Sequence, residues 1–306
     1  MKTILVTGSE GFVGTYFIKV LNEEDYKIVP ICYPLLLPNK ETYIPLDIIN
    51  TDMTLEVLKT HEPDIIFHLA ALSSVSKSLR DRPLTYNTNI MGTVNLLEAA
   101  LLLNKRVRFI FISTCEVYGD GGNKMSETSK ISLKSPYAVS KYAAELICRS
   151  YGSAGIDCVI LRPFNHIGPG QAEDFVMPTI AKQIAEIEKG KRPPLIELGN
   201  IEAKREFMNV QDIIDAYTLA IKKCKPGEIY NISSNNGYTV AEAIEIFKKS
   251  SKKEFEIKVD PSRVRKDDIP VLIGNGSKFS DLTGWQPKIK FKKTIEDLLN
   301  YWRAKI

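Results

Sequence analysis

The sequence predicts an α/β fold in which a doubly wound, Rossmann-type parallel sheet is joined to a smaller, partly interwoven C-terminal domain. Short runs rich in β-branched residues alternate with longer amphipathic segments through the first half of the chain, as in βαβ units. These runs are apolar throughout, for example Ile65-Ile66-Phe67, which is typical of strands covered by helices on both faces. A glycine-rich turn separates the first run from the first amphipathic segment.

Each predicted element follows from these periodicities. In the first half, strands are expected at residues 3–7, 27–31, 43–46, 64–68, 107–112 and 156–161, and helices at residues 12–21, 52–60, 84–103 and 136–151. Beyond Arg162 the alternation loosens, and we expect a helix at 177–189 and strands near 206–210 and 228–232. A capping-box pattern from Thr239 to Glu242 then opens a further helix.

Composition excludes several classes of protein. A chain of 306 residues with 44% hydrophobic residues can fold without disulfides or metals, and a net charge of +4 is too small for a nucleic-acid-binding face. The five cysteines are scattered, which indicates reduced thiols in the cytoplasm. The sequence shows no leader pattern and no long apolar run, so no membrane span is expected. The three histidines lack metal-ligand spacing, so no metal site is expected.

The glycine-rich turn predicts a dinucleotide site. Gly8, Gly11 and Gly14 let the backbone turn sharply and approach a pyrophosphate, which would lie on the N-terminus of the helix that begins near Phe12 and Val13. The end of the second strand normally carries an acidic residue for NAD or a basic one for NADP. Here it reads Cys32-Tyr33-Pro34, so the choice between the two cofactors stays open.

A second motif pairs a phenol with an ammonium. Tyr137 and Lys141 are four residues apart and therefore share one face of a helix. A nearby ammonium favours the phenolate, which makes Tyr137 a candidate acid/base for proton transfer to or from a substrate oxygen. The same spacing recurs at Tyr301 and Lys305, which we interpret as a solvated helix face. The first copy is distinguished by Thr114, a hydroxyl after the fifth apolar run that can bind the same substrate oxygen.

Further motifs complete a family resemblance. With Phe67-His68-Leu69-Ala70-Ala71, the 88–93 segment and Ser135-Pro136-Tyr137, the chain resembles the extended short-chain dehydrogenase/reductase family over essentially its full length. The resemblance implies NAD or NADP, held by the glycine loop, by Lys141 and by Asp47, Ile48, Leu69, Ala70 and Ala71. It also implies a homodimer formed through the helices at 84–103 and 136–151.

The second half narrows the resemblance. Residues 162–171, with Phe175-Val176, Gly199-Asn200 and residues 269–274, are similar to the GDP-6-deoxy-4-keto-mannose reductases. This implies hydride transfer at C4 of GDP-4-keto-6-deoxy-mannose or a related heptose. It also implies a dinucleotide-binding domain at 1–165, to which 206–233 returns, and a nucleotide-sugar-binding domain mainly at 166–306. Substrate contacts carry over to matching positions, with the arginines on the pyrophosphate: Ser73, Ser74, Asn165, Val176, Arg205, Arg265 and Asp268.

Glu116 keeps other reactions open. It lies where sugar-nucleotide 4,6-dehydratases carry a catalytic base, while Cys115, a poor proton donor, occupies the position of the acid in some of them. Because Glu116 could act as such a base, a GDP-mannose 4,6-dehydratase-like reaction remains an alternative. A C4 epimerase or C4 dehydrogenase would use the same tyrosine, lysine and threonine. Outside enzymes, the alternative is an NAD(P)-binding redox sensor, although such proteins typically lose the Tyr–Lys pair.

Overall fold

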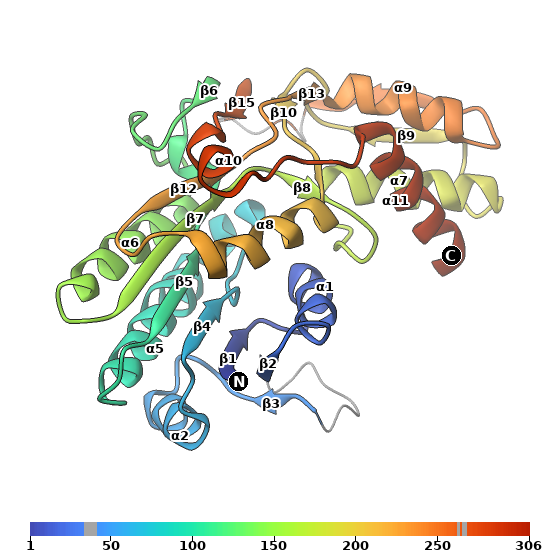
Figure 1. Ribbon diagram of the computed structural model, residues 1–306. Coiled ribbons are helices and arrows are strands. Elements are labelled where there is room, and N and C mark those ends of the chain that lie inside the picture. Colours follow the sequence, from blue (N-terminus) through green and yellow to red (C-terminus); the bar gives the residue numbers. More distant parts are fainter. Residues whose placement is uncertain (34–41, 262–263, 265–267) are drawn as a thin grey trace.

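The structure, a computed structural model, describes residues 1–33, 42–261, 264 and 268–306. Its main element is a seven-stranded parallel sheet (Figure 1) in the order β12-β7-β5-β4-β1-β2-β3. The strands are β1 (Lys2–Thr7), β2 (Tyr26–Cys32), β3 (Ile44–Pro45), β4 (Ile65–His68), β5 (Arg108–Ile112), β7 (Asp157–Pro163) and β12 (Ile229–Ile232). The predicted Rossmann-type sheet is confirmed, and its strands agree with the expected positions.

Helices cover both faces of this sheet. Ile4 and Val6 of β1 pack in one core with α1 (Phe12–Leu21), α8 (Val210–Lys223) and α10 (Ser277–Thr283). Leu5, between them, points to the opposite face and packs with α2 (Thr51–His61), α5 (Gly92–Leu101) and α6 (Pro136–Gly152). Because side chains alternate along a strand, a strand buried on both faces must be apolar at every position, as the sequence is here.

Strand order changes direction between β1 and β4. The chain runs outward from β1 to β2 and β3, then crosses back to β4 and continues to β5, β7 and β12. The loops after β1 and β4 therefore diverge, and a crevice at the carboxyl ends of such strands is where open α/β sheets bind ligands.

The helix expected at 84–103 is divided in the structure. It consists of α4 (Arg82–Tyr86), a π-helical turn (Asn87–Met91) and α5. The Asn89 side chain bonds the backbone of Leu72 in a neighbouring loop, and the Thr93 hydroxyl donates to the Asn89 carbonyl oxygen at 2.7 Å. These polar contacts accompany the wider turn, which apolar periodicity alone did not predict. Such turns frequently occur at functional sites.

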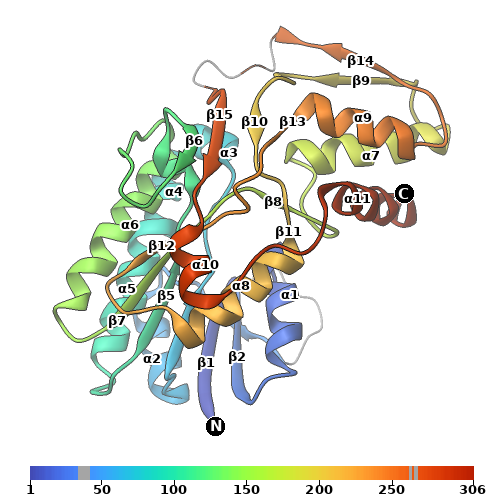
Figure 2. The same ribbon diagram turned by 45° about the horizontal axis from the view of Figure 1, so that its top comes forward.

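A second lobe is built from the C-terminal part of the chain (Figure 2). Its core packs α7 (Val176–Glu188), α9 (Val240–Ser250) and α11 (Phe291–Lys305) with β9 (Leu195–Leu198), which pairs with β14 (Glu256–Val259). The predicted capping box is present at the start of α9, where Thr239 and Glu242 bond reciprocally.

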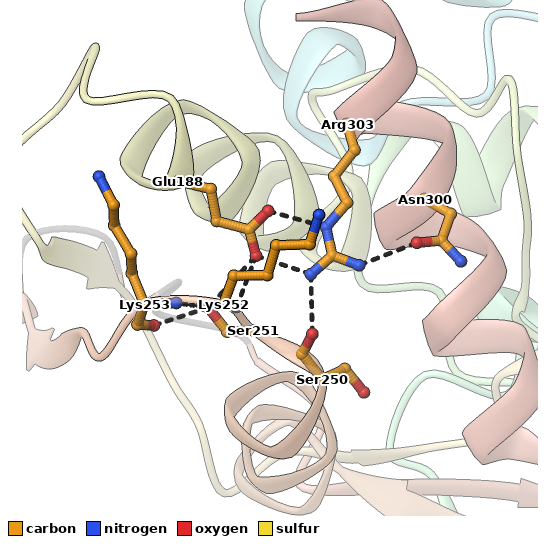
Figure 3. Close-up of polar contacts among 7 residues, drawn as sticks. All are labelled: Glu188, Ser250, Ser251, Lys252, Lys253, Asn300 and Arg303. Atoms are coloured by element: carbon orange, nitrogen blue, oxygen red, sulfur yellow. Dashed lines mark hydrogen bonds and ion pairs between the residues drawn. The ribbon is translucent and has the colours of Figure 1, made fainter.

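One buried carboxylate joins the three helices of this lobe. Glu188 at the end of α7 accepts two hydrogen bonds from the Arg303 guanidinium of α11, at 2.7 and 2.8 Å, and one from the Lys252 backbone at 2.9 Å (Figure 3). Arg303 also donates to the Ser250 carbonyl oxygen at the end of α9. The planar guanidinium thereby binds a carboxylate of α7 and a terminal carbonyl oxygen of α9 at the same time.

The two lobes are interwoven. A four-stranded sheet runs β13 (Tyr238–Thr239), β10 (Lys204–Arg205), β15 (Val271–Gly274) and β6 (Gly122–Met125), so that a strand from the first half completes a sheet of the second. β8 (His166–Ile167) pairs with β11 (Met208–Asn209). The strand expected at 206–210 is shortened to β11, since Val210 already begins α8. The Glu206 carboxylate before it binds Ser233, Ser234 and the Gly274 backbone. The division at residue 165 stays a prediction.

No helix in the described part of the chain is sufficiently long and apolar to cross a membrane.

Candidate active site

The three glycines of the first loop meet different steric demands. Gly8 follows β1 with a φ of 67°, and a Cβ there would lie 2.8 Å from the Ala70 backbone nitrogen. Gly11 is the N-cap of α1 and donates its N–H to the Gly8 carbonyl oxygen at 3.1 Å. A Cβ at Gly14 would lie 2.2 Å from the same oxygen. The loop is thus packed closely against the start of α1 and the segment after β4, and a side chain at Gly8 or Gly14 would open it.

This loop presents a helix N-terminus to the crevice. Among the described residues, no side chain caps the first N–H groups of α1, so these donors can bind a pyrophosphate. Phe12 begins the helix and stacks on His166 with ring centroids 6.2 Å apart, while Val13 packs against the core. The geometry therefore fits a dinucleotide.

The other predicted cofactor residues lie at neighbouring strand ends. Leu69 and Ala70 follow β4 and donate backbone N–H groups to the Thr7 carbonyl and hydroxyl oxygens, each at 3.2 Å, with Ala71 next in the chain. Asp47 and Ile48 come shortly after β3. The Asp47 carboxylate accepts a hydrogen bond from the Ile49 nitrogen at 3.2 Å. The Ile48 side chain fills the space beside Gly92 at the start of α5. Their cofactor contacts stay predictions.

Tyr137 lies in the first turn of α6. Ser135 caps this helix, Pro136 begins it, and the Tyr137 backbone nitrogen donates to the Ser78 hydroxyl of α3 (Val75–Arg80) at 3.2 Å. Burial raises the pKa of Tyr137 above its usual value, and a hydrogen bond from the Thr114 hydroxyl opposes that shift. The negative charge of nearby Glu116 raises the pKa further. Tyr137, Thr114 and Glu116 are therefore together, as the sequence predicts.

Lys141 is one helical turn further and almost fully buried, with 2% of the residue exposed. Its Nζ lies 4.2 Å from the centre of the Phe111 ring, and burial lowers the pKa of Lys141 to about 8. The expected lowering of the Tyr137 pKa is not found, because burial of the phenol raises that pKa. The lysine charge is therefore held in a low-dielectric site in which it acts strongly on an arriving ligand.

A buried ion pair anchors this part of α6. Glu145, a turn beyond Lys141, accepts from Arg162 Nε and Nη2 at 2.9 and 2.6 Å and from the Ser113 hydroxyl. Arg162 also donates to the Tyr118 hydroxyl at 3.0 Å. Since Ser113 precedes Thr114 in the chain, the pair fixes the hydroxyl and the Tyr–Lys helix to one another. Sequence reasoning missed these residues, although Glu145 at i+4 from Lys141 was a spacing that could have indicated it.

A second buried network connects the glycine loop to the π-helical turn. The Thr93 hydroxyl donates to the Asn89 carbonyl oxygen, so its contact with His68 Nε2 at 3.0 Å requires the imidazole to be the donor. His68 Nδ1 then accepts from the Thr7 hydroxyl at 2.7 Å. Burial, together with the charge of Lys141, keeps the pKa of His68 well below its usual value, consistent with this neutral tautomer.

The network continues from the π-helical turn to the catalytic helix. The Asn89 amide donates to the Ser140 hydroxyl at 2.9 Å, and that hydroxyl donates to the Tyr137 carbonyl oxygen at 2.8 Å. We call the series Thr7, His68, Thr93, Asn89 and Ser140 the buried hydrogen-bond chain. Its members come from distant parts of the sequence, so no local spacing predicted it.

Three of the predicted nucleotide-sugar residues, Asn165, Arg205 and Asp268, lie near the same point. Cys115 Sγ donates to the Asn165 amide oxygen at 3.8 Å, and the positive charge of Arg205 acts on the Cys115 thiol. Arg205 pairs with Asp268 at 3.3 Å, and Asp268 also accepts from the Asn200 amide at 2.7 Å. Asn200 belongs to the Gly199-Asn200 segment of the family resemblance, which had suggested no role for this side chain. The predicted Arg265 lies outside the described residues.

The remaining predicted contacts lie on α3 and α7. The Ser74 hydroxyl caps α3 by accepting from the Lys77 nitrogen at 3.3 Å, and Ser73 before it is exposed. Lys77 forms an ion pair at 3.0 Å with Asp174, two residues before Val176, which begins α7 and is 40% exposed. The structure thus brings the Ser73–Ser74 and Val176 segments towards each other. Within the described ranges, no group of His, Cys, Asp and Glu is arranged to hold a metal ion.

Comparison with known proteins identifies the family of this arrangement. The family model described as "GDP-mannose 4,6 dehydratase" matches residues 5–298. The chain is 33% identical to the GDP-6-deoxy-D-mannose reductase of Pseudomonas aeruginosa, over 100% of this chain and 98% of the relative. It is also 33% identical to the GDP-6-deoxy-D-talose 4-dehydrogenase of Aggregatibacter actinomycetemcomitans, over 92% and 91%.

A solved structure agrees. RMD from Pseudomonas aeruginosa, complexed with NADPH, superposes with a TM-score of 0.90 at 30% identity and covers both chains completely. The predicted enzyme class, the nicotinamide cofactor and the extended short-chain dehydrogenase/reductase fold are confirmed. The chain therefore belongs to the GDP-mannose 4,6 dehydratase family of the extended short-chain dehydrogenases/reductases.

Proposed function

We propose that this enzyme transfers hydride between a nicotinamide and C4 of a 4-keto-6-deoxy sugar, mannose or a related heptose, carried on GDP. The observation that carries the proposal is the Thr114–Tyr137 hydrogen bond, with the ammonium of Lys141 one helical turn away. The similarity to a GDP-6-deoxy-D-mannose reductase over the full chain supports the GDP-sugar and the carbon that reacts.

Each group in this arrangement has a chemical task. The bound nicotinamide supplies or accepts the hydride. Tyr137 donates a proton to the sugar oxygen as the carbonyl is reduced, because its raised pKa keeps it protonated until a substrate oxygen needs the proton. Thr114 holds that oxygen by its hydroxyl. Lys141 binds the cofactor ribose, and its charge stabilises the phenolate that proton transfer leaves behind.

The thiol of Cys115 favours reduction over dehydration. A dehydratase must protonate the departing C6 hydroxyl, and burial raises the pKa of Cys115 well above its usual value, which makes it a poor acid. Glu116 beside it then serves as a polar contact to the sugar. The oxidative direction is the second candidate, because a GDP-6-deoxy-D-talose 4-dehydrogenase is equally similar and hydride transfer in either direction uses the same side chains.

Arg205 is suited to the diphosphate of the substrate. Its guanidinium is 12% exposed and is held by Asp268, so it is oriented before substrate arrives. Asn165, fixed by Cys115 and by the Met208 backbone at 3.0 Å, would hold the sugar, and Asp268 the nucleotide ribose. In this proposal residues 1–165 with 206–233 bind the dinucleotide, and 166–306 mainly bind the nucleotide-sugar.

We further propose that the enzyme is a cytoplasmic homodimer. All five cysteines are free and buried, which suits a reducing compartment. Leu79, Leu84, Met91 and Leu146 are each close to half exposed, on the helices around the start of α5 and on α6. Exposed apolar side chains on neighbouring elements are typical of a protein interface.

The decisive experiment is a reduction assay. Purified protein is incubated with GDP-4-keto-6-deoxy-mannose and NADH or NADPH while absorbance at about 340 nm is followed. We expect cofactor oxidation, reduced about 10²- to 10⁴-fold in Tyr137→Phe. Tyr301→Phe, in the second Tyr–Lys spacing, serves as the control with unchanged turnover. Loss of water from GDP-mannose without net cofactor change would instead establish a dehydratase.

A further inference from the structure

The end of β2 is occupied by a carboxylate that comes from the glycine loop. Glu10 lies between Gly8 and Gly11, and its Oε1 accepts the Tyr33 backbone N–H at 3.0 Å. Its second oxygen, Oε2, is buried and has no hydrogen-bond partner among the described residues. A buried, unpartnered carboxylate oxygen is costly unless a ligand completes its bonding.

The negative charge of Glu10 acts on the groups around the end of β2. After burial, its charge is the second cause that raises the pKa of the Cys32 thiol, at the end of β2, and of the Tyr43 hydroxyl, just before β3. Across the part of the chain that the structure describes, no lysine or arginine forms an ion pair with Glu10. None of the described lysines and arginines therefore neutralises the Glu10 carboxylate through an ion pair.

This place matters because of where a dinucleotide lies on a Rossmann sheet. With a pyrophosphate on the N-terminus of α1, the adenosine ribose would lie at the end of β2, where an acidic residue of the strand itself usually binds the 2′-hydroxyl in Rossmann folds. Here β2 ends at Cys32 and is followed by Tyr33, and neither residue is a carboxylic acid. The carboxylate of Glu10, which bonds the Tyr33 N–H, supplies an acceptor at this place from the glycine loop.

We propose that Glu10 makes this enzyme select NAD(H) over NADP(H). This inference rests on the proposed nicotinamide chemistry and goes beyond it by assigning the form of the cofactor. A ribose 2′-hydroxyl can donate to the free Oε2, which then gains its partner. A 2′-phosphate carries only acceptors and negative charge at neutral pH, so it meets repulsion and competes with Glu10 for the Tyr33 N–H. The proposal separates this chain from the Pseudomonas aeruginosa RMD, which was solved with NADPH.

Binding measurements test the proposal without the sugar substrate. Dissociation constants for NADH and NADPH are obtained by fluorescence titration for the wild-type protein, Glu10→Gln and Glu23→Gln. Glu10→Gln keeps an oxygen for the Tyr33 N–H while removing the charge. Glu23→Gln removes one exposed charge beyond the end of α1 and is the matched control.

The wild-type protein is expected to bind NADH at least about tenfold more tightly than NADPH. Glu10→Gln should reduce that ratio to about threefold or less, mainly by tightening NADPH, and Glu23→Gln should preserve it. Equal or tighter NADPH binding by the wild type would overturn the proposal, as would a Glu10→Gln protein that weakens for both cofactors alike. If the protein prefers NADH but does not reduce the GDP-sugar, the proposed substrate is refuted while the role of Glu10 still holds.

Discussion

At the scale of single residues, Lys141 shows that a reactive group can lower the stability of the folded protein. Its ammonium is buried above the Phe111 ring, and burial lowers the pKa of Lys141 to about 8. A charge removed from water in this way costs stability, because the neighbouring Glu145 is already committed to Arg162. The lysine is retained because the cofactor and the phenolate need a positive charge at this point.

Lys141→Met should therefore stabilise the protein while it inactivates the enzyme. We expect the free energy of unfolding at pH 7 to rise by on the order of 1–3 kcal/mol. We also expect kcat to fall by at least about a hundredfold. Urea unfolding and the reduction assay measure the two effects.

The stability gain should depend on pH. Below about pH 8 both the folded and the unfolded wild-type chain carry the lysine charge, so the full cost of burial applies. Between about 8 and the ordinary value of 10.5, only the unfolded chain keeps the proton, so wild-type stability rises with pH. The advantage of the methionine variant should shrink from pH 7 to pH 9. An advantage that grew with pH would contradict the assigned burial of the charge.

At the scale of elements, α6, which carries Tyr137 and Lys141, is held in place by contacts that could not be predicted from the sequence. Tyr137 and Lys141 could be proposed from the sequence because they are one helical turn apart. Thr114 could be proposed because it comes shortly after an apolar strand. Ser78 could not, since it is 59 residues from Tyr137 and nothing local marks a serine that will bond a distant backbone nitrogen. The π-helical turn was missed for the same reason: its side-chain partners are fixed only when β4, α3 and α6 come together.

Thr93→Val tests whether the buried hydrogen-bond chain positions Tyr137. The substitution keeps the shape of the side chain but breaks the contacts with His68 and Asn89. A displacement of the phenol should lower kcat by about tenfold to a hundredfold, with a much smaller change in KM for the sugar. Amide hydrogen exchange should accelerate in the first turn of α6. Thr93→Ser should restore both quantities.

Thr283→Val is the control for this test. Its hydroxyl also donates to the carbonyl oxygen four residues earlier, at 2.7 Å, and accepts one hydrogen bond, from the Trp285 nitrogen at 3.1 Å. It lies on α10, which is not part of the site. If Thr283→Val lowers kcat as much as Thr93→Val does, the effect is a general loss of stability and not a matter of position.

The glycine loop gives a second test at this scale. A Cβ at Gly14 would meet the backbone of Gly8 and Ser9, neither of which can move without opening the loop. Gly14→Ala should therefore raise the cofactor dissociation constant by at least about tenfold while the protein stays folded. Gly152→Ala, at the end of α6, would meet nothing within 4 Å and should bind cofactor normally. Calorimetry on both variants measures this, and normal binding by Gly14→Ala would count against the loop as the pyrophosphate site.

At the scale of the whole molecule, the parallel sheet was predictable and the construction of the second lobe was not. Continuous apolar runs announce buried strands at their own positions, so β1, β4 and β5 appear where expected. By contrast β6 reads Gly-Asn-Lys-Met, with no apolar pattern, and becomes a strand because it pairs with β15. Short strands defined by their partners carry little information of their own.

The proposed dimer belongs to this scale. Leu146 on α6 is 47% exposed. Leu146→Glu should place charges in the interface and convert the protein to a monomer in sedimentation experiments. Val259→Glu, at 46% exposure on β14, is the matched control and should leave the mass unchanged. A wild-type protein that already sediments as a monomer at micromolar concentration would end the proposal.

The pairing of β6 with β15 has a consequence for how this protein can be made and rearranged. On the ribosome, β6 emerges early and waits without its partner until nearly the entire chain has been synthesised, because β15 lies close to the C-terminus. The small sheet is therefore among the last parts to close. A gene fragment that encodes only one lobe would leave an open strand edge on its product, so exchange of sugar specificity between relatives by recombination must carry this strand along or supply a compatible one.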